Sequence, residues 1–311
     1  MPELAPGSLP SRLAALGAAL GLPPLRLSLE TFPSKPWRSA RHATLRELLR
    51  VDGEPRYSVK WYARDHPRPF AELAGTSAAF GRATGLRTPV FVARADLPAA
   101  VGLVEEWIPG ARDLASALAA GAVEPSHAET LLTELHLAMQ AAPALATDSL
   151  AEDRRRCLQA LVWLGEGSAD FAPLRDWLLG PYAPFSPVTR LLHEDLLPCN
   201  VLLTSPGRAV LVDFDHCLPS RMPWYAAWRL GWFSSSLPVP SVSAGGVLAD
   251  QRVRLLCVAL EVERQFSVLE RTRFLHDWKS AWCRELLQGR EAVPGAAAES
   301  RRLSLQLEHS P

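Results

Sequence analysis

One stretch constrains this sequence more than any other: LLHEDLLPCNVLLTSPGRAVLVDFDHC, residues 191–217. It contains His193-x-Asp195-x4-Asn200, then two apolar runs around a Ser-Pro-Gly turn, and then Asp-Phe-Asp at 213–215. The apolar runs predict a hairpin of two buried strands. The first motif arises by chance in about 1% of chains this long, but the acidic group that follows it across a hairpin argues against coincidence.

These residue types suit the transfer of a phosphoryl group. That reaction needs a carboxylate to orient and deprotonate a hydroxyl, and oxygen ligands to hold Mg²⁺ against the phosphates. Asp195 and Asn200, on one tight loop, offer both, and Asp213 after the returning strand would complete a metal site. The plain alternative is a turn capped by Asp and His between two buried strands.

A lysine in the middle of an apolar strand is a second candidate. Lys60 lies in Val59-Lys60-Trp61, and a buried ammonium is costly without a partner. Glu72, on the next predicted helix, is the natural partner, so we expect a Lys60–Glu72 ion pair. The plain alternative leaves Lys60 in solvent on an edge strand, but the motif at 191–217 favours a catalytic lysine.

The remaining pattern is β-rich first and α-rich later, which predicts an α+β protein with two lobes. Alternating apolar text and turn residues predict strands at 25–32, 42–51, 56–63, 90–93 and 101–106, and helical spacing predicts a helix at 68–84. The segment 42–51 also suits a helix. Later helices are predicted at 113–120, 125–140, 151–165, 174–179, 224–233 and within 248–287.

From these patterns we expect three parts of the chain. Residues 1–106 form an N-lobe with a nucleotide-binding sheet and one helix. Residues 107–290 form a C-lobe with the catalytic loop, metal site and acceptor site, and residues 291–311 form a loose tail.

With these motifs in place, the chain resembles the protein-kinase-like superfamily of small-molecule kinases, which includes aminoglycoside phosphotransferases and choline kinases. It is most similar to the bacterial lipopolysaccharide kinases that phosphorylate Kdo or heptose. The resemblance runs from about residue 40 to about residue 235 and is carried by SVKWYARDHPRPFAEL, GLRTPV, EEWIPGARDL and HEDLLPCNVLL…LVDFDHC. It implies a bilobal protein-kinase-like fold, with a β-rich N-lobe and a mostly helical C-lobe.

The resemblance also implies the nucleotide contacts, with ATP as cofactor. Lys60 would contact the ATP phosphates and act in catalysis, and Glu72 would hold it. The backbone of Glu105, Glu106 and Trp107 would form the hinge that reads adenine.

The implied catalytic loop follows the motif residue by residue. Asp195 would be the catalytic base and His193 a structural brace of the loop. Asn200 and Asp213 would be the Mg²⁺ ligands.

Two departures from the superfamily pattern bear on activity. The segment 32–41, where a Gly-rich phosphate loop is expected, contains no glycine, so Ser34, Ser39 and backbone amides would have to serve. Asp215 replaces the usual glycine after Asp-Phe, as in several sugar and lipopolysaccharide kinases. A catalytically inactive, nucleotide-binding pseudokinase therefore stays open as an alternative.

Charge and composition limit the binding partners and the cellular location that we expect for this chain. The net charge is zero, so no basic field recruits nucleic acid. The five cysteines include no CxxC pair, and the sequence has no long apolar run and no signal peptide, so we expect a cytoplasmic protein. Arginines crowd the N-lobe, and a peripheral contact with the inner membrane is kept as an alternative.

We therefore expect an ATP- and Mg²⁺-dependent phosphotransferase that acts on a hydroxyl of a small-molecule or glycolipid acceptor. The first expectation is a lipopolysaccharide core sugar (Kdo or heptose), and the alternative is an aminoglycoside or another small molecule. Trp224, Trp228 and Trp232 share one helix face, which favours packing in the core over contact with an acceptor.

Overall fold

The computed structural model describes residues 7–32, 45–165, 172–181, 183–205 and 208–232, with residues 250, 252–253, 255–257 and 259–260 beyond them. The chain divides into two compact units. The first contains residues 1–113 and 201–215, and the second contains residues 114–200 and 216–311. The expected tail at 291–311 and most of the helix expected within 248–287 lie outside the described residues.

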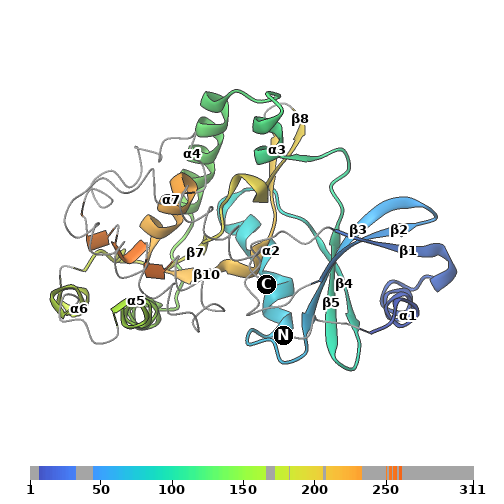
Figure 1. Ribbon diagram of the computed structural model, residues 1–311, viewed down its shortest axis with the longest axis horizontal. Helices are drawn as coiled ribbons and strands as arrows, with labels where there is room; N and C mark the ends of the chain where they lie inside the picture. Colours follow the sequence, from blue (N-terminus) through green and yellow to red (C-terminus); the bar gives the residue numbers. More distant parts are fainter. Residues whose placement is uncertain are drawn as a thin grey trace, which may run out of the picture. The chain divides into compact units, whose positions relative to one another are not determined.

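The first unit is built on a five-stranded antiparallel sheet with the strand order β1-β2-β3-β5-β4 (Figure 1). The strands are β1 (Leu27–Thr31), β2 (Leu45–Val51), β3 (Glu54–Ala63), β4 (Phe91–Asp96) and β5 (Ala100–Glu106). Asp52 and Gly53 join β2 to β3 with φ of 53° and 83°, the geometry of the tight hairpin turn that favours Asp-Gly.

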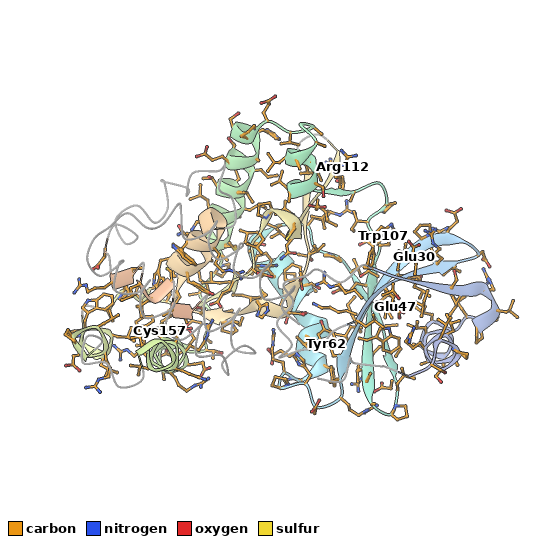
Figure 2. All side chains as sticks on the ribbon, in the orientation of Figure 1. Glu30, Glu47, Tyr62, Trp107, Arg112 and Cys157 are labelled. Atoms are coloured by element: carbon orange, nitrogen blue, oxygen red, sulfur yellow. The ribbon has the colours of Figure 1, made fainter. Side chains whose placement is uncertain are left out.

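The segment 42–51, whose sequence suits either a strand or a helix, contains strand β2. Its Glu47 is a charged residue at a buried position of the strand. The Glu47 side chain is fully buried within the sheet (Figure 2). Its carboxylate accepts hydrogen bonds from Trp61 Nε1 (2.8 Å) and Arg12 Nη2 (3.0 Å). Because these partners satisfy the buried charge, a glutamate can occupy an inward position of a strand.

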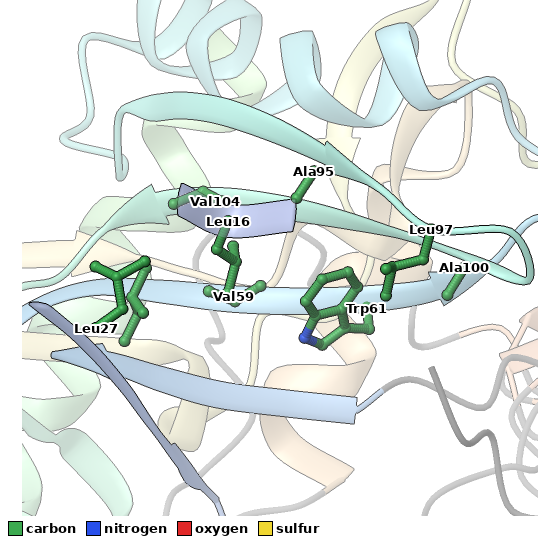
Figure 3. Close-up of a cluster of buried hydrophobic side chains, with 9 residues drawn as sticks. Leu16, Leu27, Val59, Trp61, Ala95, Leu97, Ala100 and Val104 are labelled. Atoms are coloured by element: carbon green, nitrogen blue, oxygen red, sulfur yellow. The ribbon is translucent and has the colours of Figure 1, made fainter. Parts of the chain in front are cut away.

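The two faces of the sheet carry different helices. On one face, α1 (Leu9–Leu20) places Leu16 in a cluster with Val59 and Trp61 of β3 (Figure 3). Alternation along β3 turns Lys60 and Tyr62 to the opposite face, where Tyr62 packs with Leu73 of α2 (Phe70–Thr84). The strand thereby points Lys60 away from the α1 side.

The predicted hairpin after the catalytic-loop motif is confirmed and belongs to the first unit. β8 (Val201–Ser205) and β9 (Arg208–Leu211) pair with each other, and β8 also pairs with β6 (Arg112–Asp113). A short 3₁₀ turn (Phe214–His216) follows. Phe214 packs against Phe80 of α2, with ring centroids 5.4 Å apart, which anchors the segment after the hairpin to this unit.

The second unit is mostly helical. Its described helices are α3 (Leu114–Ala119), α4 (Pro125–Ala141), α5 (Leu150–Gly165), α6 (Ala172–Leu179) and α7 (Pro223–Trp232). Strands β7 (Arg190–His193) and β10 (Cys217–Ser220) pair antiparallel, and both α4 and α7 pack against β7. The expected α+β class, with a β-rich first part and a helical second part, is confirmed.

The tryptophan stripe on α7 packs inward where its side chains are described. Trp224 and Trp228 are 2% and 3% exposed. Trp224 Nε1 also donates a hydrogen bond to the carbonyl of Pro184 at 2.7 Å. The core interpretation is confirmed for these two residues, while the side chain of Trp232 lies outside the description. None of the described helices has the length and apolar character needed to cross a membrane.

Candidate functional site

In the first unit, Lys60 meets the Asp-Phe-Asp segment. Lys60 Nζ lies 2.7 Å from Asp213 Oδ1 and also contacts the Asp215 carboxylate. The Lys60 side chain is 11% exposed, and the two carboxylates offset much of the cost of burying its charge. Residues more than 150 positions apart in sequence therefore form one charged cluster on the sheet face that carries α2.

Asp213 is held in an unusual conformation at the end of the hairpin. Its φ is 70°, in the left-handed region that Asp and Asn tolerate better than most residues. Its second carboxylate oxygen, Oδ2, lies 2.5 Å from Arg46 Nη2. Burial opposes the charge on Arg46, but the carboxylates of Asp213 and Asp215 raise its pKa above the usual value. Asp213 is thus positioned by one cation on each oxygen.

Asp215 is bound at three points within the same unit. Besides contacting Lys60, its Oδ1 accepts a hydrogen bond from the Tyr62 hydroxyl (2.6 Å), and its carbonyl accepts one from Arg68 Nη1 (2.8 Å). Burial alone would raise the pKa of Asp215, but Lys60 lowers it below the usual value. Burial and Asp215 raise the pKa of Tyr62 well above its usual value, so the phenol remains a hydrogen-bond donor.

The expected Lys60–Glu72 ion pair is not formed, and this expectation was wrong. The Glu72 carboxylate instead pairs with Arg68, one turn earlier, at 2.8 Å. The Glu72 side chain is 52% exposed, whereas Lys60 is buried against Asp213 and Asp215. The nearer carboxylates of the Asp-Phe-Asp segment take the place that sequence proximity suggested for Glu72.

The predicted hinge continues from strand β5. The Glu106 amide donates to the carbonyl of Val90 (2.8 Å), and the Trp107 amide donates to that of Arg56 (3.1 Å). These two donors are therefore used within the fold, and an adenine ring would have to use the carbonyl oxygens of this segment or another amide. Burial raises the pKa of the Glu105 carboxyl, against the opposing effect of nearby Lys60.

The second unit contains the catalytic-loop motif. His193 is fully buried at the end of β7, and its Nδ1 accepts a hydrogen bond from the Asp195 amide (3.3 Å). Asn200 Nδ2 donates to the Asp195 carbonyl (2.8 Å) and to its Oδ2 (3.1 Å). The loop between His193 and Asn200 is therefore closed on itself, and the Asp195 side chain is 13% exposed.

Two arginines, the buried Arg229 and the partly buried Arg156, bind the acidic residues of this loop. Arg229 of α7 lies 2.6 Å from Asp195 Oδ1 and donates to the Glu194 carbonyl at 2.7 Å. Arg156 of α5 pairs with the Glu194 carboxylate, with Nη1 3.1 Å from Oε1. Although burial opposes it, Glu194 raises the pKa of Arg156 above the usual value.

The sequence-predicted residues thus fall into two groups. Lys60 and Asp213 meet in the first unit, and His193, Asp195 and Asn200 meet in the second.

Sequence reasoning missed four charged or polar partners: Arg46, Tyr62, Arg156 and Arg229. Arg46 and Tyr62 share a sheet face with Lys60, so strand alternation offered a signal for them. Arg229 is the one charged residue of α7, and from the sequence only the tryptophans of this helix were considered.

The proposed metal ligands have suitable chemistry for Mg²⁺. Asp213 offers a carboxylate and Asn200 an amide, and Mg²⁺ prefers oxygen ligands. The Asn200 amide nitrogen faces two oxygens of Asp195, which assigns the other side of the amide to its oxygen. Asp213 belongs to the first unit and Asn200 to the second, and each has donor chemistry that suits Mg²⁺.

The segment expected to replace a Gly-rich loop lies almost entirely outside the described residues. Its first residue, Phe32, stacks on Trp107 with ring centroids 5.9 Å apart. The hinge segment and the end of β1 are thereby in contact within the first unit.

Comparisons with known proteins identify the fold. No protein-family model matches the sequence, and no curated protein matches it. A crystal structure assigned as a fructosamine-3-kinase from Haemophilus somnus 129PT is similar with a TM-score of 0.51 at 12% identity, covering 88% of this chain and 96% of its own. This likeness shows that the chain has a protein-kinase-like fold.

Two aminoglycoside phosphotransferases are also similar. APH(3'')-Id from Streptomyces rimosus gives a TM-score of 0.45 at 16% identity, covering 87% of this chain and 96% of its own. ADP-bound APH(2'')-Ib gives a TM-score of 0.48 at 15% identity, covering 86% and 94%. The resemblance to lipopolysaccharide kinases rests on the sequence motifs and stays a prediction.

Proposed function

We propose that the protein is an ATP- and Mg²⁺-dependent phosphotransferase that moves the γ-phosphoryl group of ATP to a hydroxyl acceptor. The observation that carries this proposal is the contact between Lys60 Nζ and Asp213 Oδ1 at 2.7 Å, on the sheet face of the first unit that carries α2. A lysine for the phosphates and a carboxylate for the metal are the two groups that phosphoryl transfer needs on the nucleotide side.

On the nucleotide side, Lys60 binds the phosphates of ATP, and Arg46 supplies a second cation on the same face. Carbonyl oxygens of the segment from Glu105 to Trp107 accept from the adenine amino group. Glu72 acts only through Arg68, which binds the Asp215 carbonyl. Asp213 and Asn200 would hold Mg²⁺, which would supply positive charge to offset the charge that develops on the phosphates.

On the acceptor side, Asp195 is the base, and His193 and Asn200 brace its loop. The acceptor hydroxyl gives its proton to the Asp195 carboxylate as its oxygen forms a bond to the γ-phosphorus. The bond from that phosphorus to the bridging oxygen breaks, and the electron pair leaves with ADP. The chemistry is mostly orientation and charge stabilisation.

We propose a sugar-bearing molecule as the acceptor, with a lipopolysaccharide core sugar first. The sequence resemblance in HEDLLPCNVLL…LVDFDHC and EEWIPGARDL supports it. A glycolipid acceptor would bring the protein to the surface of the inner membrane. An aminoglycoside is the alternative, because the structural neighbours include enzymes named for that substrate.

The test is transfer of label from γ-labelled ATP, with Mg²⁺, to a panel of acceptors: dephosphorylated lipopolysaccharide core, Kdo, heptose, several aminoglycosides and water alone. Asp195→Asn removes the base, and Asp176→Asn, at an exposed carboxylate, is the matched control. We expect label on a sugar acceptor in the wild type and in Asp176→Asn, and its loss in Asp195→Asn.

The remaining outcomes separate the alternatives. Label on an aminoglycoside alone would keep the phosphotransferase and exclude the lipopolysaccharide acceptor. Binding of ATP without transfer to any acceptor, equal in wild type and Asp195→Asn, would contradict the proposal and favour the pseudokinase.

A further inference from the structure

Arg229 is a buried cation bound directly to the proposed catalytic base. Its side chain is 3% exposed, and it reaches Asp195 Oδ1 at 2.6 Å and the carbonyl of Glu194 at 2.7 Å. We propose that Arg229 is a positioning residue that fixes the carboxylate of Asp195 for phosphoryl transfer, an inference that rests on the proposed function. No role for Arg229 was predicted from the sequence.

The contacts define the orientation of the Asp195 carboxylate. Oδ1 is bound by Arg229 and Oδ2 by the amide of Asn200 at 3.1 Å. An ion pair on one oxygen and a hydrogen bond on the other limit the rotation of this carboxylate about its χ2 bond. Asn200 sets one side of this arrangement, and Arg229 sets the other.

The second contact of Arg229 ties the orientation to the backbone. By donating to the Glu194 carbonyl, the same guanidinium binds the peptide immediately before Asp195. A guanidinium is a planar fork with five donors, so it can hold a carbonyl and a carboxylate in one fixed geometry. A lysine ammonium is a single point of charge and holds the two acceptors less rigidly.

The two consecutive acids of the loop, Glu194 and Asp195, have different arginine partners. Glu194 is 2% exposed, and its carboxylate pairs with Arg156 of α5. Arg156 also lies 3.3 Å from Asp153. Each of the consecutive acids thus has its own arginine, from α5 for Glu194 and from α7 for Asp195. The carboxylate of Glu194 is thus paired with Arg156, while the guanidinium of Arg229 contacts the carboxylate of Asp195.

A positioning role and a purely structural role differ in kinetics. Loss of orientation lowers kcat, because an active-site displacement of about 1 Å can cost 10- to 100-fold in rate. It leaves KM for ATP unchanged, since the nucleotide contacts proposed above lie on Lys60, Arg46 and the hinge segment. A purely structural role would lower the melting temperature without selectively lowering kcat.

The experiment compares Arg229→Met, Arg229→Lys and Arg12→Met with the wild type. Arg12 also pairs with a fully buried carboxylate, that of Glu47, on the α1 face of the sheet. It is therefore a control for loss of an arginine that pairs with a buried carboxylate. Steady-state transfer from γ-labelled ATP to the best acceptor gives kcat and KM, and thermal unfolding gives the melting temperature.

We expect Arg229→Met to lower kcat by about 10- to 100-fold, with KM for ATP unchanged. Arg229→Lys should fall between it and the wild type. Arg12→Met should lower the melting temperature and keep kcat within about threefold. Equal losses of kcat in Arg12→Met and Arg229→Met, or wild-type kcat in Arg229→Met, would overturn the inference.

Two further outcomes keep the test decisive. If Arg229→Met does not fold, Arg229→Lys decides, and wild-type kcat in that variant would overturn the inference. If wild-type transfer does not exceed that of Asp195→Asn, the proposed function fails, and this inference fails with it. Failure of the inference alone is recognised by an active wild type whose kcat does not depend on Arg229.

Discussion

Arg46 and Lys60 lie directly opposite each other on β2 and β3, and each contacts a different oxygen of the Asp213 carboxylate. Cross-strand partners point to the same face of a sheet. The first unit therefore presents two cations, not one, on the face that we propose for the ATP phosphates. Under the proposed function, the second cation would supply part of the phosphate binding that a Gly-rich loop provides in kinases.

We expect Arg46→Gln to raise KM for ATP by about tenfold, because it removes one charged hydrogen-bond donor. Arg50→Gln is the matched control, since Arg50 is on the same strand but pairs with the exposed Glu30. Steady-state kinetics with varied ATP would measure both. An equal change in the two variants would mean that Arg46 acts only through the surface charge of the strand.

The different partners of Glu72 and Asp215 lead to a second prediction. Glu72→Gln removes a half-exposed ion pair with Arg68, so we expect kcat/KM to stay within about twofold. Asp215→Asn removes a partly buried charge partner of the buried Lys60, and we expect kcat/KM to fall about tenfold. The same transfer assay measures both. A larger loss for Glu72→Gln would restore it as the functional partner of Lys60.

Local patterns in the sequence were enough to predict much of the fold. Alternating apolar residues located β3 and β5, the Asp52-Gly53 turn located a hairpin, and the two apolar runs after Asn200 located β8 and β9. These features depend on neighbours in the chain, which is why they are readable without a structure.

Side-chain contacts between residues far apart in the sequence could not be predicted. The strand β2 can contain the buried Glu47 because Trp61 and Arg12 donate hydrogen bonds to its carboxylate. Lys60 pairs with residues more than 150 positions away, so the choice of Glu72 by proximity failed. In each case burial selected a partner that neither periodicity nor spacing specifies.

A third prediction concerns His136 of α4 and acid stability. The side chain is 1% exposed, and its Nε2 lies 3.0 Å from the amide nitrogen of Gln140. Burial lowers the pKa of His136 from 6.5 to about 4. Between these values the unfolded chain binds a proton that the folded chain does not, so stability falls as pH drops through this window.

We therefore expect the wild type to lose about 2 kcal/mol more unfolding free energy than His136→Gln when the pH is lowered from 7 to 5. Urea unfolding at the two pH values measures this difference, and titrating carboxylates affect both proteins alike. The same loss in both proteins would show that His136 is protonated in the folded state.

A fourth prediction tests the packing of the α1 face through Gly102 of β5. A Cβ at this position would lie 2.8 Å from the ring of Trp61, and Trp61 is fully buried, so little space is available for the ring to shift. We expect Gly102→Ala to destabilise the protein by about 1–3 kcal/mol. Gly75→Ala is the control, because Gly75 is an exposed position of α2 with open space around it. There, alanine should stabilise by about 0.5–1 kcal/mol. Thermal unfolding distinguishes the opposite signs, and a neutral Gly102→Ala would mean that Trp61 can repack.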